Sequence, residues 1–557
     1  MIYTIIALEK VDIMLDNNKK YEGFIKLIIY VIAIILTYIY ILYRIIYTLP
    51  LKLGWLNLVF GILLLFVEIY ETIDFTIYFF NILRYSKKSL EVPKIKENEY
   101  PEIDVFIATI NESEELLSRT IEGCLNMKYP YKDKVHIYLC DDGNRLNIKL
   151  LARKYNINYI TRKDNKGAKA GNYNNAIKNS HSPLIATFDA DMCPTENFLL
   201  TTIPFFIKYD KVGFVQLPQS FLEPDIFQLR FGLSKDIPFE QDYFYHRIQI
   251  AKNNTNSTIY CGTNAVISRK ALKACNGFSL KSISEDIATG MLIESCGFRG
   301  ISLNNVEAYG YATQDLEAFC KQRSRWGRGC IQMFKNHKIL RNKGLSLSQK
   351  LEYLSSVSYW FYGVKRIIFL LVPLLFSLFG IITIDCSLLI FSCFFFPQYL
   401  VKRIALDLLE GKRRSSTWNK IYEIILAPIM AGEAIKELFG FGSTKFEVTP
   451  KEKWSSKMSK ANKKLISYHT LFLVLTIFGI VLSIYKITLT NITTYLFPLL
   501  WLIVNLFYLV IALIFDFRIN PIYYDNFIPN NTYKYRFKSI PSIFLGIFKK
   551  KFKGDAT

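Results

Sequence analysis

Long apolar runs dominate both ends of the chain, and short apolar runs alternate with polar residues in its middle. A helix needs about 20 mostly apolar residues to cross a bilayer. Six runs approach or exceed this length and predict membrane-spanning helices, whereas the middle of the chain predicts a soluble domain. The six runs cover residues 24–47, 55–83, 367–384, 387–401, 466–485 and 495–515.

The middle segment, residues 100–335, is built from short apolar stretches that are each followed by a turn or a helical pattern. Strands that alternate with helices indicate a doubly wound, mostly parallel α/β sheet. Polar residues follow the ends of several predicted strands, which is where such sheets bind ligands. The predicted strands cover residues 103–108, 135–140, 158–160 and 184–188, and the predicted helices cover 114–127 and a segment from 170.

The remaining segments are distinguished by composition. The stretch before the third span, Leu345 to Gly363, is amphipathic and aromatic-rich, which is typical of helices on a membrane surface. A second amphipathic piece, Trp418 to Phe439, lies in the basic segment after the fourth span. The predicted parts are an N-terminal segment (1–23), two spans (24–85), interfacial helices (336–366), two spans (367–401), a basic cytoplasmic segment (402–464), two spans (465–515) and a basic tail (516–557).

Composition and charge support a membrane protein. Apolar residues make up 51% of the 557 residues and aromatic residues 15%, which is unusual for a soluble enzyme. The formal net charge is +22, and Lys and Arg are scarce in the loops at 48–53, 383–386 and 487–493. The positive-inside rule therefore places the α/β domain in the cytoplasm, with the spans in contact with lipid. No nucleic-acid-binding signature occurs, so we expect no nucleic-acid partner.

Two acidic residues, Glu68 and Glu71, fall inside the second predicted span. Acidic side chains within a span normally face a protein interior or a water-filled path. Alternatively, the span ends early and both residues lie at the membrane surface. The sequence leaves these two interpretations open.

The strand from Leu184 to Phe188 is followed by Asp189-Ala190-Asp191. Two carboxylates at positions i and i+2 of a strand point to the same side. At the carboxyl end of a buried parallel strand they face the ligand-binding crevice, and such oxygen ligands suit Mg²⁺ or Mn²⁺. The simpler alternative is a strand that ends in an acidic turn.

Two further positions have a plausible role at the same crevice. Asp142 follows a predicted strand and could accept a hydrogen bond from a base or a ribose, although Asp141-Asp142-Gly143 is also an ordinary turn sequence. Lys169 lies beside the start of a predicted helix, where a cation suits a diphosphate. A solvated loop lysine is the alternative.

Seven short motifs then occur in one order along the chain, and together they resemble the processive membrane glycosyltransferases of family 2, most closely the bacterial cellulose synthase type. The motifs are Asp141-Asp142-Gly143, Lys169-Ala170-Gly171-Asn172, Asp189-Ala190-Asp191, Cys261-Gly262-Thr263-Asn264, Ser284-Glu285-Asp286, Gln322-Arg323-Ser324-Arg325-Trp326 and Phe446-Glu447-Val448-Thr449-Pro450-Lys451.

The resemblance implies a GT-A type (Rossmann-like) domain inserted between six transmembrane helices. It implies that Asp191 and Asp189 hold Mg²⁺ or Mn²⁺, and that Cys261, Gly262 and Trp326 lie at the acceptor sugar. The residues expected to bind the UDP-sugar are Thr109, Glu112, Asp142, Lys169, Asp189, Asp191, Gln322, Arg323, Arg325, Thr449 and Lys451.

By the same resemblance, Asp286 is the catalytic base, with Glu285 beside it. Transfer to a sugar hydroxyl requires removal of its proton, which a positioned carboxylate can accept. Ser284 replaces the family's Thr, and a Ser-x-Asp sequence is also a common helix N-cap. The segment 446–451 resembles the family's gating loop, which closes over the nucleotide.

The expected product is a β-glucan made from UDP-glucose, with β-1,4 or mixed β-1,3/1,4 linkages, exported through the spans. An accessory export subunit is a further possible partner. After the sixth span we find no pattern for the cyclic-di-GMP-binding β-barrel (PilZ) of regulated relatives. The alternatives are a synthase that uses UDP-N-acetylglucosamine or another donor, and a non-catalytic membrane channel.

Overall fold

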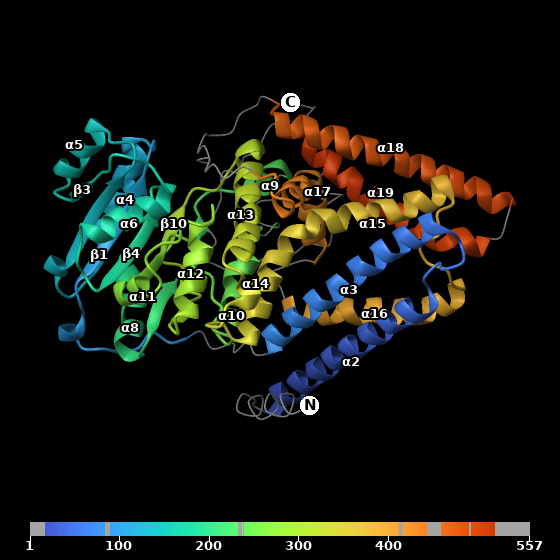
Figure 1. The fold of residues 1–557 in the computed structure, drawn as a ribbon, viewed down its shortest axis with the longest axis horizontal. Helices are drawn as coiled ribbons and strands as arrows, with labels where there is room; N and C mark the ends of the chain where they lie inside the picture. Colours follow the sequence, from blue (N-terminus) through green and yellow to red (C-terminus); the bar gives the residue numbers. More distant parts are fainter. Residues whose placement is uncertain are drawn as a thin grey trace.

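The computed structural model of the chain describes residues 17–83, 90–231, 237, 239–410, 416–442, 458–489 and 492–518, and every structural statement below refers to these residues. The molecule has two parts (Figure 1). An α/β domain lies at one end, and a group of long helices extends away from it at the other. Several shorter helices fill the region between the two parts.

A seven-stranded mixed sheet forms the centre of the α/β domain, in the order β3-β2-β1-β4-β8-β6-β9. All pairings are parallel except the two made by β8, so the expected mostly parallel sheet is confirmed. A small second sheet has the order β5-β10-β7. The strands are β1 (Ile103–Thr109), β2 (Val135–Asp141), β3 (Asn158–Ile160), β4 (Leu184–Asp189), β5 (Cys193–Pro194), β6 (Val212–Gln216), β7 (Ser220–Phe221), β8 (Ala265–Ser268), β9 (Arg299–Ser302) and β10 (Ala308–Gly310).

Helices cover both faces of the main sheet, and local sequence explains where some of them start. Ser113 caps the first helix by accepting a hydrogen bond from the Leu116 N–H, and two glutamates in the first turn favour the same end. The helices of the domain are α4 (Glu114–Asn126), α5 (Leu146–Lys154), α6 (Ala168–Lys178), α7 (Phe198–Thr202), α8 (Pro204–Lys208), α9 (Ile226–Phe231), α10 (Gln249–Lys252), α11 (Arg269–Ala274), α12 (Glu285–Ser295) and α13 (Leu316–Asn336).

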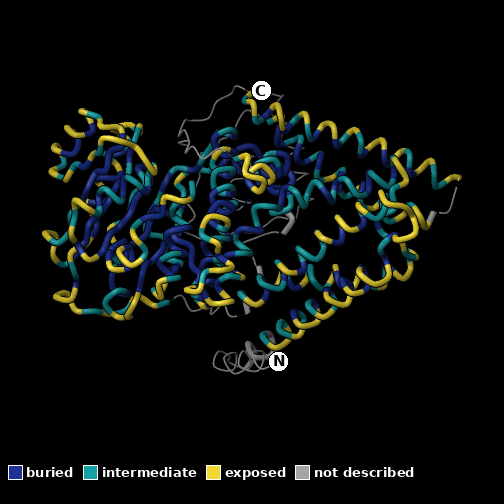
Figure 2. Tube along the Cα trace, in the orientation of Figure 1, coloured by how far each residue is buried: buried dark blue, intermediate teal, exposed yellow. Residues whose placement is uncertain are grey.

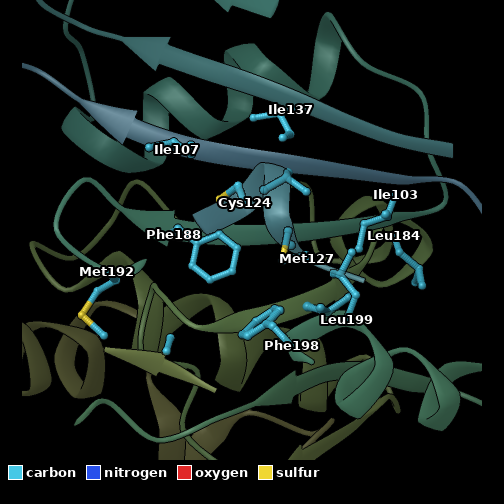
Figure 3. Close-up of a cluster of buried hydrophobic side chains, with 14 of the residues drawn as sticks. Ile103, Ile107, Cys124, Met127, Ile137, Leu184, Phe188, Met192, Phe198 and Leu199 are labelled. Carbon is cyan, nitrogen blue, oxygen red and sulfur yellow. The ribbon is translucent and has the colours of Figure 1, made fainter. Parts of the chain in front are cut away.

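The largest apolar cluster of the domain lies on one face of the sheet (Figure 3). Phe188 of β4 packs against Phe198 of α7 with the ring centroids 4.7 Å apart. Ile107 of β1 and Cys124 of α4 belong to the same buried cluster. Because burial of one large apolar side chain contributes about 1.5–3 kcal/mol, this cluster stabilises the packing of the helices on this face of the sheet.

The long helices agree with the six predicted spans, with different ends. Within the described residues, six segments are long and apolar enough to cross a membrane. Large apolar side chains are exposed along their outer surfaces (Figure 2), as expected for helices that face lipid. The helices are α2 (Asn17–Tyr47), α3 (Trp55–Leu83), α15 (Tyr362–Phe379), α16 (Leu388–Glu410), α18 (Lys460–Leu489) and α19 (Ile492–Phe517).

Two of these helices depart from the predicted ends. α15 stops at Phe379, five residues before the predicted end, because Gly380 adopts a left-handed conformation with φ 71°. α16 continues nine residues past the predicted end at Val401, through Lys402 and Arg403. Hydropathy predicted an end at these cations, but both line an internal cavity, where charge is tolerated.

Helices α14 (Leu347–Ser358) and α17 (Ser416–Leu438) lie between the domain and the spans, next to α13 of the domain (Figure 1). α14 runs across the direction of α15, and both belong to one helical segment, Leu347–Phe379, that is apolar enough to cross a membrane. The interfacial position of residues 336–366 stays a prediction. Phe227 of α9 ties the two parts together. Its ring lies 5.4 Å from that of Phe319, 4.4 Å from that of Tyr422 and 5.0 Å from that of Phe515.

Candidate active site

The carboxyl ends of β1, β2 and β4 border a cavity of about 820 Å³ that contains almost all of the predicted site residues. Gly262 lies beside it, since its carbonyl oxygen accepts a hydrogen bond from Lys169. Thr449 and Lys451, with the rest of the predicted gating loop, lie outside the described residues. The predicted residues that line the cavity are Thr109, Glu112, Asp142, Lys169, Asp189, Asp191, Cys261, Glu285, Asp286, Gln322, Arg323, Arg325 and Trp326.

Lys169 lines this cavity from the first turn of α6. Its Nζ is 2.5 Å from Asp189 Oδ1 and 2.9 Å from the Gly262 carbonyl oxygen. Burial disfavours its charge, but Asp189 and Glu285 outweigh that effect and raise the pKa of Lys169. A lysine held protonated here can neutralise a bound diphosphate.

Asp189 is the last residue of β4, and Asp191 follows in the turn. The side chain of Asp189 is 38% exposed, whereas Asp191 is buried, and both line the same cavity. The prediction that they face one crevice is therefore confirmed. Two carboxylates in a polar cavity are a suitable donor set for Mg²⁺ or Mn²⁺, and these residues would hold such an ion.

Asp142 has a partner that the sequence did not reveal. Arg162 contacts both carboxylate oxygens of Asp142, with Nε–Oδ1 at 2.6 Å and Nη2–Oδ2 at 2.7 Å. This bidentate pair orients the carboxylate at the cavity wall. Arg162 also donates to the carbonyl oxygens of Lys166 and Ala168, so it holds the turn that precedes Lys169.

Thr109 and Glu112 form a linked pair at the end of β1. The Thr109 hydroxyl donates to Glu112 Oε2 over 2.7 Å, and Arg145 donates to the Thr109 hydroxyl over the same distance. Arg145 also donates to Asp141. The two predicted nucleotide-binding residues are thus preorganised by an arginine that sequence reasoning missed.

Glu285 and Asp286 begin α12 and face the cavity. Asp286 Oδ1 accepts a hydrogen bond from the Ile287 N–H over 2.9 Å. Burial raises the pKa of Glu285, and the charge of Asp286 raises it further. Burial also raises the pKa of Asp286 above the usual range of an aspartate. A carboxylate that is a better proton acceptor than usual fits the expected role of a base.

The Glu285 and Asp286 pair should determine how kcat/KM depends on pH. The base must be deprotonated to act, so kcat/KM should fall as the pH drops through the raised pKa of Asp286. In Glu285→Gln one negative charge is removed, which makes the Asp286 anion less unfavourable and lowers its pKa. The acidic limb of the kcat/KM profile should therefore move to lower pH in this variant. A limb that stays in place or moves upward would contradict the predicted repulsion.

Ser284 occupies the N-cap position of α12, as the alternative interpretation of this motif required, but its side chain makes no capping hydrogen bond. Its hydroxyl instead lies against α13. A Cβ placed on Gly329 would be 1.9 Å from Ser284 Oγ and 2.8 Å from the Ser284 backbone nitrogen. The glycine therefore permits the close approach of α13 to the segment that carries Glu285 and Asp286.

Gly329→Ala should consequently displace Ser284 and the adjacent acids. We expect turnover to fall by roughly 10–100-fold, since a shift of about 1 Å in a catalytic group has this effect. Gly432→Ala in α17 is the matched control, because no atom lies within 4 Å of the added Cβ. Initial rates of both variants, with thermal melts to verify folding, test the prediction. Equal rates would show that α12 tolerates the displacement.

The predicted face of α13 is confirmed, since Gln322, Arg325 and Trp326 all line the cavity. Arg323 has contacts that the sequence did not suggest. Its Nη2 lies 2.6 Å from Glu240 Oε2, and its guanidinium lies 4.4 Å from the centroid of the Trp326 ring. These contacts suit an arginine that positions the tryptophan.

Gln216 of β6 forms hydrogen bonds with the backbone of the loop that contains Cys261 and Gly262. The Gln216 Oε1 accepts from the Cys261 N–H over 2.8 Å, and its Nε2 donates to the Thr263 carbonyl oxygen over 2.8 Å. Thr263 in turn accepts from the Asp189 N–H over 2.9 Å. Gln216 is thus a buried positioning residue that sequence reasoning did not identify.

A larger cavity of about 1330 Å³ continues from this site along the spans. Both cavities are lined by Cys261, Asp286 and Trp326, so they meet at the expected acceptor position. The larger cavity extends to the turn around Asp385 and to Thr493 at the start of α19, which lie at the far ends of the spans.

The larger cavity resolves the two interpretations of the acids in the second span. Glu68 and Glu71 both line it. Glu68 pairs with the buried Arg44 at 2.8 Å and accepts a hydrogen bond from Tyr40 over 2.8 Å. These acids therefore face an interior cavity and not the membrane surface.

Comparisons with known proteins agree with this site. Residues 104–275 match the model of glycosyl transferase family 2. The chain is 32% identical over 424 residues to the cellulose synthase catalytic subunit (UDP-forming) of Pseudomonas fluorescens (strain SBW25), which covers 76% of this chain and 57% of the relative. It is 30% identical over 448 residues to the cellulose synthase 1 catalytic subunit (UDP-forming) of Komagataeibacter xylinus, which covers 80% of this chain and 60% of the relative.

The chain thus spans less than two thirds of the length of these relatives. Among solved structures, a mannosyltransferase from Pyrobaculum calidifontis in complex with GDP-Man and Mn²⁺ superposes with a TM-score of 0.48 and 16% identity, over 69% of this chain and 99% of the other. The family match covers β1, β2, β4 and the loop with Cys261. The chain therefore combines six helices that are long and apolar enough to cross a membrane with an α/β domain of glycosyl transferase family 2.

Proposed function

We propose that the protein is a processive, inverting β-glucan synthase that polymerises glucose from UDP-glucose and exports the polymer across the plasma membrane. The observation that carries the proposal is the meeting of two cavities at Asp286 and Trp326. A transferase that released its product after each step would need no cavity that continues through its own spans.

In the proposed reaction, the acceptor hydroxyl lies between Trp326 and Asp286. Asp286 takes the hydroxyl proton while the oxygen attacks the anomeric carbon of glucose, and the bond from that carbon to the UDP oxygen breaks. One direct displacement converts the α-linkage of the donor into a β-linkage. The proton ends on Asp286, and UDP leaves with the bonding electrons.

The other side chains bind the donor. Asp142, oriented by Arg162, accepts hydrogen bonds from the nucleoside. Lys169 and Arg325 lie on the cavity wall, where they can contact the diphosphate. A bound Mg²⁺ or Mn²⁺, held by Asp189 and Asp191, would supply positive charge that stabilises departing UDP.

The composition of the larger cavity favours an uncharged polymer. Its lining carries eight acidic and seven basic side chains, so its charges nearly cancel. Several of them are paired with each other, such as Arg366 with Glu423 at 2.6 Å. A polymer with a carboxylate on alternate sugars would need an excess of cations. Aromatic rings that line this cavity, including Tyr399 and Trp501, offer flat surfaces for pyranose rings.

The test is to incubate purified full-length protein with radiolabelled UDP-glucose and Mg²⁺ or Mn²⁺, and then digest any ethanol-insoluble product. Material that cellulase degrades and lichenase does not would establish a β-1,4-glucan synthase. Release of short oligosaccharides by lichenase would establish a mixed-linkage synthase. Polymer formed only from UDP-N-acetylglucosamine or another donor would overturn the assigned substrate. No transfer from any donor would favour a non-catalytic channel.

A further inference from the structure

Three potential metal ligands meet at the edge of the sheet opposite the active site. Glu102 precedes β1, His136 is the second residue of β2, and His181 lies in the loop before β4. One ligating atom from each lies within 4.8 Å of the other two. These ligands come from three separate segments, and they include two of the five histidines in the chain.

The backbone around this cluster is rigid. The loop with His181 is fixed through the next residue, Ser182, whose N–H and hydroxyl donate to Asp104 over 3.0 and 2.7 Å. Arg269 donates to the Ser182 carbonyl oxygen and pairs with Asp104, both over 2.6 Å. His136 lies opposite Asp104 in the parallel register of β1 and β2. Ligands on such fixed segments lose little freedom when an ion binds.

The histidine side chains are arranged for a shared ligand. Their ring centroids are 5.8 Å apart, and His181 Nε2 lies 3.9 Å from Glu102 Oε2. His136 Nε2 is shielded from solvent, and no hydrogen-bond partner contacts it among the described residues. A shielded ring nitrogen without a partner is unfavourable, and a metal ion would satisfy it. The exposed side chains of His181 and Glu102 can adjust to the ion.

We propose that Glu102, His136 and His181 bind a divalent transition-metal ion of the Zn²⁺ class. Two imidazoles and one carboxylate form a usual zinc donor set, with solvent in the remaining position. Asp189 and Asp191, in contrast, offer only oxygen ligands, which suit Mg²⁺ or Mn²⁺. The ion would join the amino-terminal ends of β1, β2 and β4, and so stabilise the sheet without taking part in glycosyl transfer.

The test uses full-length protein in detergent without a polyhistidine tag, because a tag would itself bind the ion. Titration with Zn²⁺ by calorimetry, and with Co²⁺ by visible absorption, should show one saturable site and a tetrahedral Co²⁺ spectrum. In His181→Ala the affinity should fall by more than roughly tenfold, as even the loss of an outer partner of a metal ligand has this effect. His136→Gln should behave in the same way.

Two controls separate this site from the active site. Asp191→Asn should retain the Co²⁺ spectrum and the Zn²⁺ affinity. His181→Ala should retain glycosyl transfer but lose the Zn²⁺-dependent rise in melting temperature that wild-type protein shows. Absence of saturable binding to the wild type, or equal affinity in wild type and His181→Ala, would overturn the proposal. Because calorimetry and absorption do not depend on turnover, the test is independent of the proposed synthase activity.

Discussion

Asp286→Asn should reduce kcat by roughly 10²–10⁴-fold, the usual contribution of general base catalysis. The amide cannot accept the acceptor proton, but it preserves the shape of the side chain and its hydrogen bond from the Ile287 N–H. Asp286 lies at the junction of the two cavities, away from Asp142 at the nucleoside end. The Kd for UDP should therefore change little. Initial rates with radiolabelled donor and calorimetric UDP titrations measure the two effects separately.

Asp210→Asn serves as the matched control, since this aspartate is exposed and does not line either cavity. It should leave both rate and affinity unchanged. If Asp286→Asn retains full turnover, another group takes the proton. If it loses UDP binding as well, the residue supports the donor pocket and is not primarily a base.

Asp191→Asn should reduce both turnover and the Mg²⁺-dependent part of the UDP affinity. Asp191 is buried beside the cavity, and with Asp189 it would hold the metal ion that accompanies the diphosphate. If the ion contributes about 3 kcal/mol to the stabilisation of leaving UDP, its loss reduces turnover by roughly 100-fold. The Mg²⁺-dependent part of UDP affinity should disappear at the same time. UDP titrations with and without Mg²⁺ and rates over a range of Mn²⁺ concentrations provide the measurement.

Asp189→Asn distinguishes the two carboxylates. Asp189 pairs with Lys169 at 2.5 Å, so its replacement also releases the lysine that faces the diphosphate. Because this change also removes a negative charge beside the diphosphate, we expect UDP binding without a metal ion to be no weaker in Asp189→Asn than in wild type. Undiminished turnover of wild-type protein after complete removal of divalent ions would refute the metal-binding role of both residues.

The spans and strands could be predicted because their signals are local. The apolar runs at 24–47 and 55–83 end at the same residues as α2 and α3. The short stretch at 184–188 lies within β4. A helix that faces lipid and a strand buried on both faces need apolar residues along their whole length. The ends were less certain, as α16 shows, because a cation ends a span only where it would meet lipid.

The predicted site residues could be found because short motifs place them at strand and helix ends, and the sheet topology then gathers those ends at one edge. The partners of these residues could not be found in this way. Arg162 lies 20 residues from Asp142, and Glu240 lies 83 residues from Arg323. Nothing in the local sequence of either arginine indicates which carboxylate it will contact.

Across the whole molecule, local sequence signals determine some features and contacts between distant segments determine the others. Hydrophobic periodicity and motif order specify the membrane helices, the α/β domain and the chemistry of its catalytic edge, since each depends on neighbours within a few residues. The continuous cavity, the interior position of Glu68 and the meeting of Glu102 with His136 and His181 depend on contacts between distant segments. Such contacts form only when the helices and strands pack, because packing alone brings side chains from different elements within bonding distance.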